Sequence, residues 1–311
     1  MKTTTVIVSG LWAAACLAAG NPSPAGAQTI LYATGFEPAE GYEVSLPLNG
    51  QLGWVGSTAP DCPGNGLRAD NGNHQAYVGI VPLCGDEQVF SLGRPVNFSP
   101  LAEGKPRVIF ATRMTILDSQ NDFHDCFRWS VFNLSGVRLL TIDFDNTSKG
   151  INYLLENSVN FVSTGRRFTN GVAMHLEVSM NFESNRWSAT LDGTALVTDQ
   201  PIARPATALT LRSIDAVWVY NFPFSPGDNA LLFDDYRITA GSEPVEPPVV
   251  AAPRFEGADF VLRVEGENGR RYAVETTSDF LTWQPLETNV VTGGSFEFRD
   301  AGVAGQPRRF Y

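Results

Sequence analysis

The stretch MHLEVSMNFE, residues 174–183, alternates without exception between apolar and polar side chains. Successive side chains of a β-strand point to opposite faces of the sheet, so this stretch predicts a strand with one buried face. The same period of two, less regular, recurs in residues 108–117, 127–133, 137–146, 186–193 and 209–220. Turn-forming sequences separate these segments, and none carries the sustained apolar stripe of a helix. We therefore predict an all-β protein built from antiparallel strands.

Strand-like segments of this kind extend from Ile30 to Thr239. About a dozen strands over roughly 200 residues are typical of a two-sheet sandwich or jelly roll. Residues 241–253, GSEPVEPPVVAAP, are rich in proline and lack an apolar period, which predicts an extended linker. The rest of the chain has strand signals of its own and enough apolar residues for a thin core. We predict a sandwich domain at 28–240 and a small separate β domain at 254–311.

Residues 1–27 have the features of a cleaved secretory signal peptide. Lys2 precedes an uncharged apolar run at 6–20, and the small-residue triplet AGA stands directly before Gln28. The run is too short for a comfortable membrane span, so we expect no transmembrane segment. The mature protein should then be secreted, either extracellular or in the cell envelope. Two alternatives stay open: a buried N-terminal helix, and lipid attachment at Cys16.

The formal net charge is −11. An acidic surface argues against nucleic acid and anionic membranes as partners, because both require clustered Lys and Arg. The basic pairs at 166–167 and 308–309 are isolated. The sequence gives no indication of the oligomeric state.

Three cysteines remain after signal cleavage, and export permits disulfide bonds. Cys62 and Cys84 both lie in loop-like sequence rich in Gly and Pro, so we favour a bridge between them over a bridge to Cys126. The rival interpretation is three unpaired, partly buried cysteines. Their long spacings do not fit a zinc site, which requires closely spaced cysteine pairs.

Two adjacent aspartates, Asp234 and Asp235, interrupt the strand-like stretch NALLFDDYRIT at 229–239. Alternation directs one of them to solvent and the other into the sheet, where an unpaired carboxylate is costly. The inward carboxylate therefore needs a partner.

Residues 29–239 resemble the concanavalin A-like lectin/glucanase superfamily, particularly the laminin-G-like jelly-roll domains of secreted bacterial proteins. The resemblance depends on the order of GFEPAEGY at 35–42, LNGQLGW at 48–54, NHQAYVG at 73–79 and the closing FDDYRIT. It implies a concanavalin A-like jelly roll. The segment beginning YAVETTSDFLTWQPLE at 272 resembles a small C-terminal β domain of exported proteins in planctomycete- and verrucomicrobium-like bacteria, with an accessory role.

The resemblance also implies a structural calcium ion between the first and last strands. In related modules a first strand carrying FE lies beside a last strand carrying DD, which matches Glu37 with Asp234 and Asp235. Calcium takes six to eight oxygen ligands in irregular geometry, so two strand ends can supply a site. The alternative is that Asp234 hydrogen-bonds a neighbouring strand and Asp235 is solvated.

A catalytic site is not evident. The β-glucan-cleaving relatives carry Glu-x-Asp-x-x-Glu on one strand, and this chain lacks that motif. Its nearest substitute is Asp143 and Asp145, which project from one strand face, although a solvent-facing strand looks the same. The sequence also lacks a nucleophile elbow, a phosphate loop and an HExxH zinc motif. We therefore favour a non-catalytic protein.

Sugar sites on β-sandwiches combine aromatic rings with polar side chains. Trp129 and Tyr153 are the aromatic candidates here, accompanied by Asp125, Arg128 and Asn152. These residues would converge if their strands were neighbours on the concave sheet. The sequence thus predicts a non-catalytic, secreted module that binds a polysaccharide or cell-surface glycan. The alternatives are a structural or adhesive envelope or matrix protein without sugar binding and, less favoured, a polysaccharide hydrolase.

Overall fold

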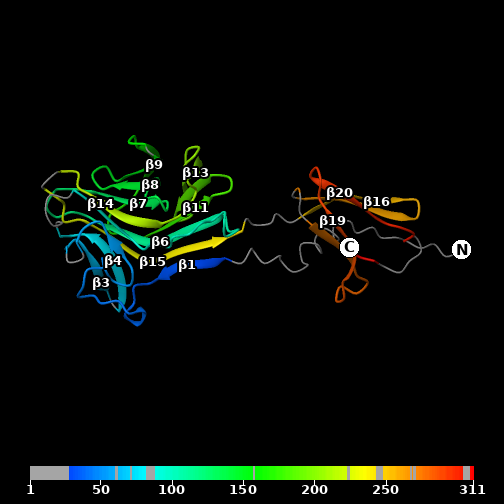
Figure 1. Ribbon diagram of the computed structural model, residues 1–311, viewed down its shortest axis with the longest axis horizontal. Helices are drawn as coiled ribbons and strands as arrows, with labels where there is room; N and C mark the ends of the chain where they lie inside the picture. The colour runs from blue at the N-terminus through cyan, green and yellow to red at the C-terminus, as the bar shows by residue number, and fades with distance from the viewer. Residues whose placement is uncertain are drawn as a thin grey trace. The chain divides into compact units, whose positions relative to one another are not determined.

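A computed structural model describes residues 28–59, 62–70, 72–81, 88–156, 158–222, 225–242, 248–266, 268, 271–303 and 309–311. These residues form two compact units, one spanning Ala27–Glu243 and the other containing Pro244–Tyr311 (Figure 1). The predicted signal peptide lies outside the described residues. Among the residues described, no helix is both long and apolar enough to cross a bilayer.

The first unit is a sandwich of two antiparallel sheets. The eight-stranded sheet has the order β13 (Thr194–Pro201), β12 (Arg186–Leu191), β11 (Met174–Asn181), β6 (Arg107–Leu117), β15 (Ala230–Gly241), β4 (Asn73–Gly79) and β3 (Asn65–Asp70), and β1 (Thr29–Thr34) also pairs with β15. The seven-stranded sheet has the order β10 (Val162–Arg167), β9 (Gly150–Leu155), β8 (Arg138–Asp145), β7 (Cys126–Phe132), β14 (Ser213–Val219), β5 (Val89–Gly93) and β2 (Val55–Gly56).

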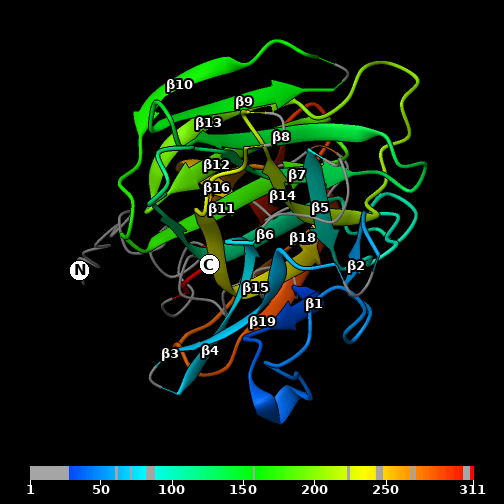
Figure 2. The same cartoon turned by 90° about the vertical axis from the view of Figure 1, so that its left-hand side faces the viewer.

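Many neighbours within each sheet are distant in sequence, as in a jelly roll, and Figure 2 labels strands of both sheets. A single 3₁₀ turn, η1 (Pro38–Glu40), interrupts the strands in the described part of this unit. The predicted all-β jelly-roll sandwich is confirmed.

Strand β11 shows how the sequence pattern becomes structure. Its residues Met174, Leu176, Val178 and Met180 are buried, while the residues between them are exposed or half-buried. The strand pairs antiparallel with β6 on one side and β12 on the other. Apolar side chains of three adjoining strands therefore share one face, which packs into the core.

Aromatic rings fill much of the space between the two sheets. The ring of Trp129 on β7 lies 5.0 Å from Phe110 on β6 and 5.3 Å from Phe233 on β15. Tyr236 on β15 lies 5.1 Å from Phe110, and its buried hydroxyl donates to the Ile214 carbonyl across the sandwich at 2.8 Å. Aromatic pairs of this kind contribute about 0.5–1.5 kcal/mol each beyond their burial. They tie the two sheets together at the centre of the unit.

The first and last strands of the sandwich pair with each other. β1 runs antiparallel to β15, with Thr34 opposite Tyr236. A β-bulge on β15 falls between Asp234 and Arg237, and Asp235 within it has a left-handed φ of 48°.

Asp234 is buried and Asp235 is exposed. The bulge interrupts the alternation, because Phe233 and Tyr236 both pack into the core. Asp234 stands opposite the exposed Arg113.

The second unit contains two small antiparallel sheets. One has the order β16 (Val249–Glu256), β17 (Asp259–Glu265) and β20 (Ser295–Asp300), and the other pairs β18 (Arg271–Thr276) with β19 (Gln284–Val290). Its core comprises Leu262, Val264, Val274, Phe298 and Tyr311. Strand β16 begins inside the segment predicted as linker, so the connection between named strands is shorter than expected.

Candidate functional site

A groove of about 470 Å³ lies on the face of the seven-stranded sheet that points away from the core. Strands β7, β8 and β9 are adjacent, and their register places Arg128, Asp143 and Asn152 side by side. Their chain neighbours point into the core, so these three polar side chains share the outer face. The groove is lined by Cys126, Arg128, Asp143, Asp145, Thr147, Asn152, Phe161, Asn221 and Phe222.

An ion pair occupies the floor of the groove. Arg128 Nε lies 2.7 Å from Asp143 Oδ1, and Asn152 Nδ2 donates to Asp143 Oδ2 at 3.3 Å. Burial raises the pKa of Asp143, while the charge and hydrogen bond of Arg128 oppose that shift. Arg128 donates no further hydrogen bond to the described residues, so its terminal nitrogens remain available to a ligand.

Exposed aromatic rings stand at the rim. Phe161, just before β10, is 41% exposed, and Phe222, just after β14, is 49% exposed. The Arg128 guanidinium lies 4.9 Å from the centre of the Phe161 ring. Phe222 packs edge-to-face against Phe123, with 5.6 Å between ring centres. Aromatic rings beside polar donors and acceptors form a surface suited to a ligand with both apolar and hydroxyl faces.

One wall of the groove depends on the fully buried carboxylate of Asp125. Its Oδ2 accepts hydrogen bonds from Trp218 Nε1 at 2.9 Å, Gly227 N at 2.9 Å and Asn229 Nδ2 at 3.1 Å. Its Oδ1 accepts from Asn221 N at 3.2 Å. Burial raises the pKa of Asp125, and the hydrogen bonds oppose that shift. The carboxylate joins the start of β7 to the segment that carries Asn221 and Phe222.

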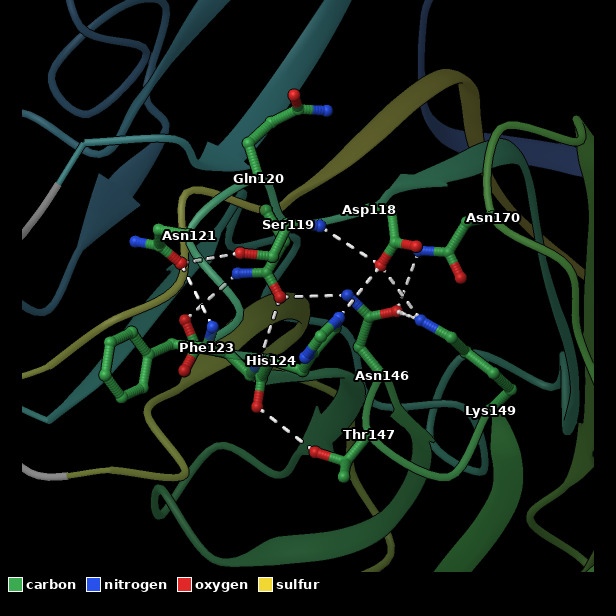
Figure 3. A network of polar contacts seen from close by, with 12 residues as sticks. Asp118, Ser119, Gln120, Asn121, Phe123, His124, Asn146, Thr147, Lys149 and Asn170 are labelled. Atoms are coloured by element: carbon green, nitrogen blue, oxygen red, sulfur yellow. Dashed lines mark hydrogen bonds and ion pairs between the residues drawn. The ribbon is translucent and has the colours of Figure 1, made fainter.

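A polar network joins the loops at the same end of the sandwich (Figure 3). His124 Nε2 lies 3.2 Å and Lys149 Nζ 3.0 Å from Asp118 Oδ1, and Figure 3 shows both side chains converging on that carboxylate. Lys149 also donates to Asn146 Oδ1 at 2.8 Å, and Asn146 donates to Asn229 Oδ1 at 2.9 Å. These contacts connect the loops that follow β6 and β8, and we interpret them as support for the groove.

Only some of the residues predicted to bind sugar line the groove. Arg128 and Asn152 line the groove. Trp129 was a wrong prediction, because it is only 1% exposed and its Nε1 donates to Met114 Sδ inside the core. Asp125 was also wrong as a ligand contact, because it is fully buried.

Tyr153 does not line the groove either. As the neighbour of Asn152 on β9, it faces the other side of the sheet, where its ring lies 5.9 Å from Trp187. Phe161 and Phe222 were missed, although aromatic residues in loops are a signal that sequence inspection could have used.

A second hollow of about 290 Å³ lies on the same outer face, over β5 and β14. Asp215 at its edge stands opposite Ser130 in the register, and its Oδ2 accepts a hydrogen bond from Ser91 Oγ at 2.7 Å. Its Oδ1 has no partner among the described residues, and burial raises the pKa of this carboxyl group. A Cβ at Gly93 would overlap Oδ1, so this carboxylate position requires glycine there.

Glu37 and Asp234 approach each other where β1 ends beside β15. Asp234 Oδ2 accepts from Asn73 Nδ2 at 2.9 Å, Asp234 Oδ1 accepts from Asp235 N at 2.7 Å, and Glu37 Oε1 accepts from His74 N at 3.2 Å. Burial raises the pKa of Asp234; Asn73 opposes this shift, and the charges of Asp235 and Glu37 add to it.

In the described part of the chain, no group of three or more His, Cys, Asp or Glu side chains is arranged to hold a metal. The contact with Asn73 on β4 and the exposure of Asp235 match the alternative without calcium. A carboxylate nevertheless has about four acceptor positions, so the two hydrogen bonds on Asp234 leave room for a cation. Calcium stays a prediction.

The structure describes two of the three cysteines that follow residue 27. Cys126 is a free, buried thiol whose Sγ lies 3.2 Å from Asn221 Oδ1. Cys62 is buried and is not a free thiol. Cys84 lies outside the described residues, so its pairing with Cys62 stays a prediction.

No family model and no curated protein matches this sequence. The structure is similar to a protein of unknown function with a galectin-like fold from Bacillus subtilis (9% identity, TM-score 0.43), covering 69% of this chain and 98% of that one. It is also similar to the CBM2 module of an evolved Dit protein from Lactobacillus casei BL23 phage J-1 (8% identity, TM-score 0.45), covering 70% and 98%.

A sialidase (8% identity, TM-score 0.43) matches over 68% of this chain and 18% of its own, so this chain spans less than a fifth of that protein. At such identities an argument about function depends on the groove itself.

Proposed function

We propose that the sandwich unit binds a glycan, without cleaving it, in the groove over β7, β8 and β9. The observation that carries this proposal is the combination of a polar floor with exposed rings at its rim, Phe161 and Phe222. The terminal nitrogens of Arg128 can donate to sugar hydroxyls, and Asn152 Oδ1 can accept from them. The two phenylalanine rings can stack against the C–H faces of the sugar.

Affinity electrophoresis on a panel of polysaccharides, followed by calorimetry with the best oligosaccharide, tests this function. Phe161→Ala and Phe222→Ala should each weaken binding about tenfold, which corresponds to about 1.4 kcal/mol. Phe255→Ala is a matched control, because Phe255 is an exposed phenylalanine of the second unit. It should leave the affinity unchanged.

Retention by no polysaccharide would refute glycan binding and favour the structural or adhesive alternative. Release of reducing sugar that Asp143→Asn abolishes would instead support the hydrolase alternative.

We also propose that the protein is exported and cleaved before Gln28, on the signal-like character of residues 1–27. N-terminal sequencing of the protein recovered from the medium or the envelope should begin at Gln28. A chain retained in the cytoplasm would contradict export, and a lipid-modified Cys16 at the N-terminus would support the anchored alternative.

A structural calcium ion between Glu37 and the Asp234–Asp235 pair is the last part of the proposal. The proposal is supported by the buried carboxylate of Asp234, which makes no ion pair within the described residues and lies near Glu37. Calcium at 100 times its dissociation constant would stabilise the fold by about 2.7 kcal/mol. Thermal unfolding with calcium and with a chelator should therefore differ by several degrees.

The calcium effect should disappear in Glu37→Gln and persist in the exposed control Glu43→Gln. Identical melting curves with calcium and with chelator would refute the calcium proposal and leave Asn73 as the partner of Asp234.

A further inference from the structure

The charges of the groove do not cancel. Three charged side chains line it, and the closed pair of Arg128 with Asp143 leaves Asp145 as the remaining charge. The hydrogen bonds to Asp145 come from neutral donors, Thr147 N at 2.9 Å and Ser148 Oγ at 2.6 Å. Asp145 is half-buried and makes no ion pair within the described residues. Its carboxylate therefore brings an uncompensated negative charge to the groove.

The nearby lysine does not neutralise this charge. Lys149 follows Asp145 by four positions, but its ammonium is bound to Asp118 and Asn146 in the neighbouring network. Arg128 is held by Asp143 at 2.7 Å. Arg166 and Arg167 on the adjoining strand β10 are exposed, and neither makes an ion pair with Asp145 in the described part of the chain.

The thiol of Cys126 also lines the groove, close to both carboxylates. Its pKa is raised to about 12, first by burial and then by the charges of Asp143 and Asp145, while Arg128 opposes the shift. The two carboxylates thus act on the same atom in the same direction.

The aromatic rim is also suited to a cation. One face of Phe161 is occupied by the guanidinium of Arg128 at 4.9 Å, so the rim ring open to a ligand cation is that of Phe222. Phe222 lines the groove with an exposed ring, and its contact with Phe123 is edge-to-face. A ligand cation above an aromatic face gains about 0.5–1 kcal/mol at exposed sites.

We infer that the groove selects amine-bearing, cationic glycans over neutral and anionic ones, with Asp145 as the residue that determines this specificity. The ligand ammonium would lie near Asp145, and its ring hydroxyls would meet Arg128 and Asn152. A uronic acid or sulfated sugar would place its anion against the carboxylate of Asp145 and be repelled. This inference depends on the proposed glycan binding and adds the chemical class of the ligand.

Calorimetry with three oligosaccharides of equal length tests the inference. The probes are an oligomer of N-acetylglucosamine, the same oligomer fully deacetylated, and an oligouronate. At about pH 5.5 the sugar amines are largely protonated and ordinary carboxylates ionised. We expect the deacetylated oligomer to bind about tenfold more tightly than its acetylated form, and the oligouronate to bind most weakly. Added salt should reduce the preference for the amine, because it screens exposed charges.

Asp145→Asn should reduce the ratio of the two affinities to about one. Glu183→Gln removes one negative charge from an exposed position on the connection between β11 and β12 and should keep the ratio. Circular dichroism would confirm that both variants are folded.

Equal affinities for the acetylated and deacetylated oligomers, tighter binding of the oligouronate, or a preference that survives in Asp145→Asn would each overturn the inference while leaving glycan binding intact. Binding of none of these probes or of any polysaccharide on the panel would overturn both.

Discussion

Replacing Asp125 with alanine tests whether one buried carboxylate holds the wall of the groove. The substitution removes the acceptor of three buried donors, Trp218 Nε1, Gly227 N and Asn229 Nδ2, and of the partly buried Asn221 N. A buried donor without a partner costs roughly 1–3 kcal/mol. Relaxation and entering water reduce the sum of four such terms. We expect a loss of about 4 kcal/mol in the free energy of unfolding, which is large for a single substitution.

Asp125→Asn should cost less, because the amide keeps one acceptor oxygen and nearly the same volume. Its NH₂ group would, however, point at a donor, and we expect a loss of about 2 kcal/mol. Urea unfolding followed by tryptophan fluorescence measures both variants, and Trp218 lies within the affected site.

Asp122→Asn is the matched control for these variants. Asp122 is exposed in the same loop and has a φ of 64°, a conformation that asparagine tolerates well. Its unfolding free energy should stay within about 0.5 kcal/mol of the wild type. If Asp125→Ala and Asp122→Asn unfold at the same urea concentration, the buried carboxylate does not stabilise the wall.

Three further outcomes are expected. When the chain from Gln28 onward is treated with an alkylating agent in urea without reductant, mass spectrometry should find one alkyl group, on Cys126; three would contradict a Cys62–Cys84 bridge. Burial raises the pKa of Asp215, so its contribution to stability is present below about pH 4 and is lost as pH rises through the folded pKa. Wild type should then lose stability relative to Asp215→Asn as the pH rises above about 4 in urea unfolding, and parallel curves would disprove this. Trp129→Phe should cost about 2 kcal/mol of stability yet keep the glycan affinity, since the ring is in the core; a tenfold loss in calorimetry would return Trp129 to the site.

The fold was predictable because its signal is local. The alternation of residues 174–183 identifies both a strand and its buried face, and the structure buries Met174, Leu176, Val178 and Met180 as expected. The same rule fails at Asp234 and Asp235, where a β-bulge lets Phe233 and Tyr236, three positions apart, both pack into the core. It could not identify Asn73 as the partner of Asp234, because that contact joins residues 161 positions apart.

The site was predicted only in part, and the errors at Trp129 and Tyr153 share one physical cause. Arg128 with Trp129, and Asn152 with Tyr153, were grouped because they are adjacent in sequence. Adjacent residues of a strand point to opposite faces, so only one member of each pair can line the groove. The polar members face the groove and the aromatic members face the interior.

The aromatic rim required information that local sequence does not carry. Phe161 precedes β10 and Phe222 follows β14, and these strands are separated in the sheet by β9, β8 and β7. Which loops extend over a sheet depends on strand order and on long-range contacts such as those of Asp125. An aromatic residue in a loop is the only local hint.

The central position of β15 has a consequence for how the chain comes to be folded. This strand, made last in the sandwich, pairs with β6 on one side and with β4 and β1 on the other. Until β15 has been synthesised, β1, β4 and β6 lack the strand with which each of them pairs. Their backbone N–H and C=O groups on that side therefore stay without their final partners for most of synthesis. Contacts between such distant segments slow folding. The larger sheet is therefore expected to form late, after β15 has been synthesised.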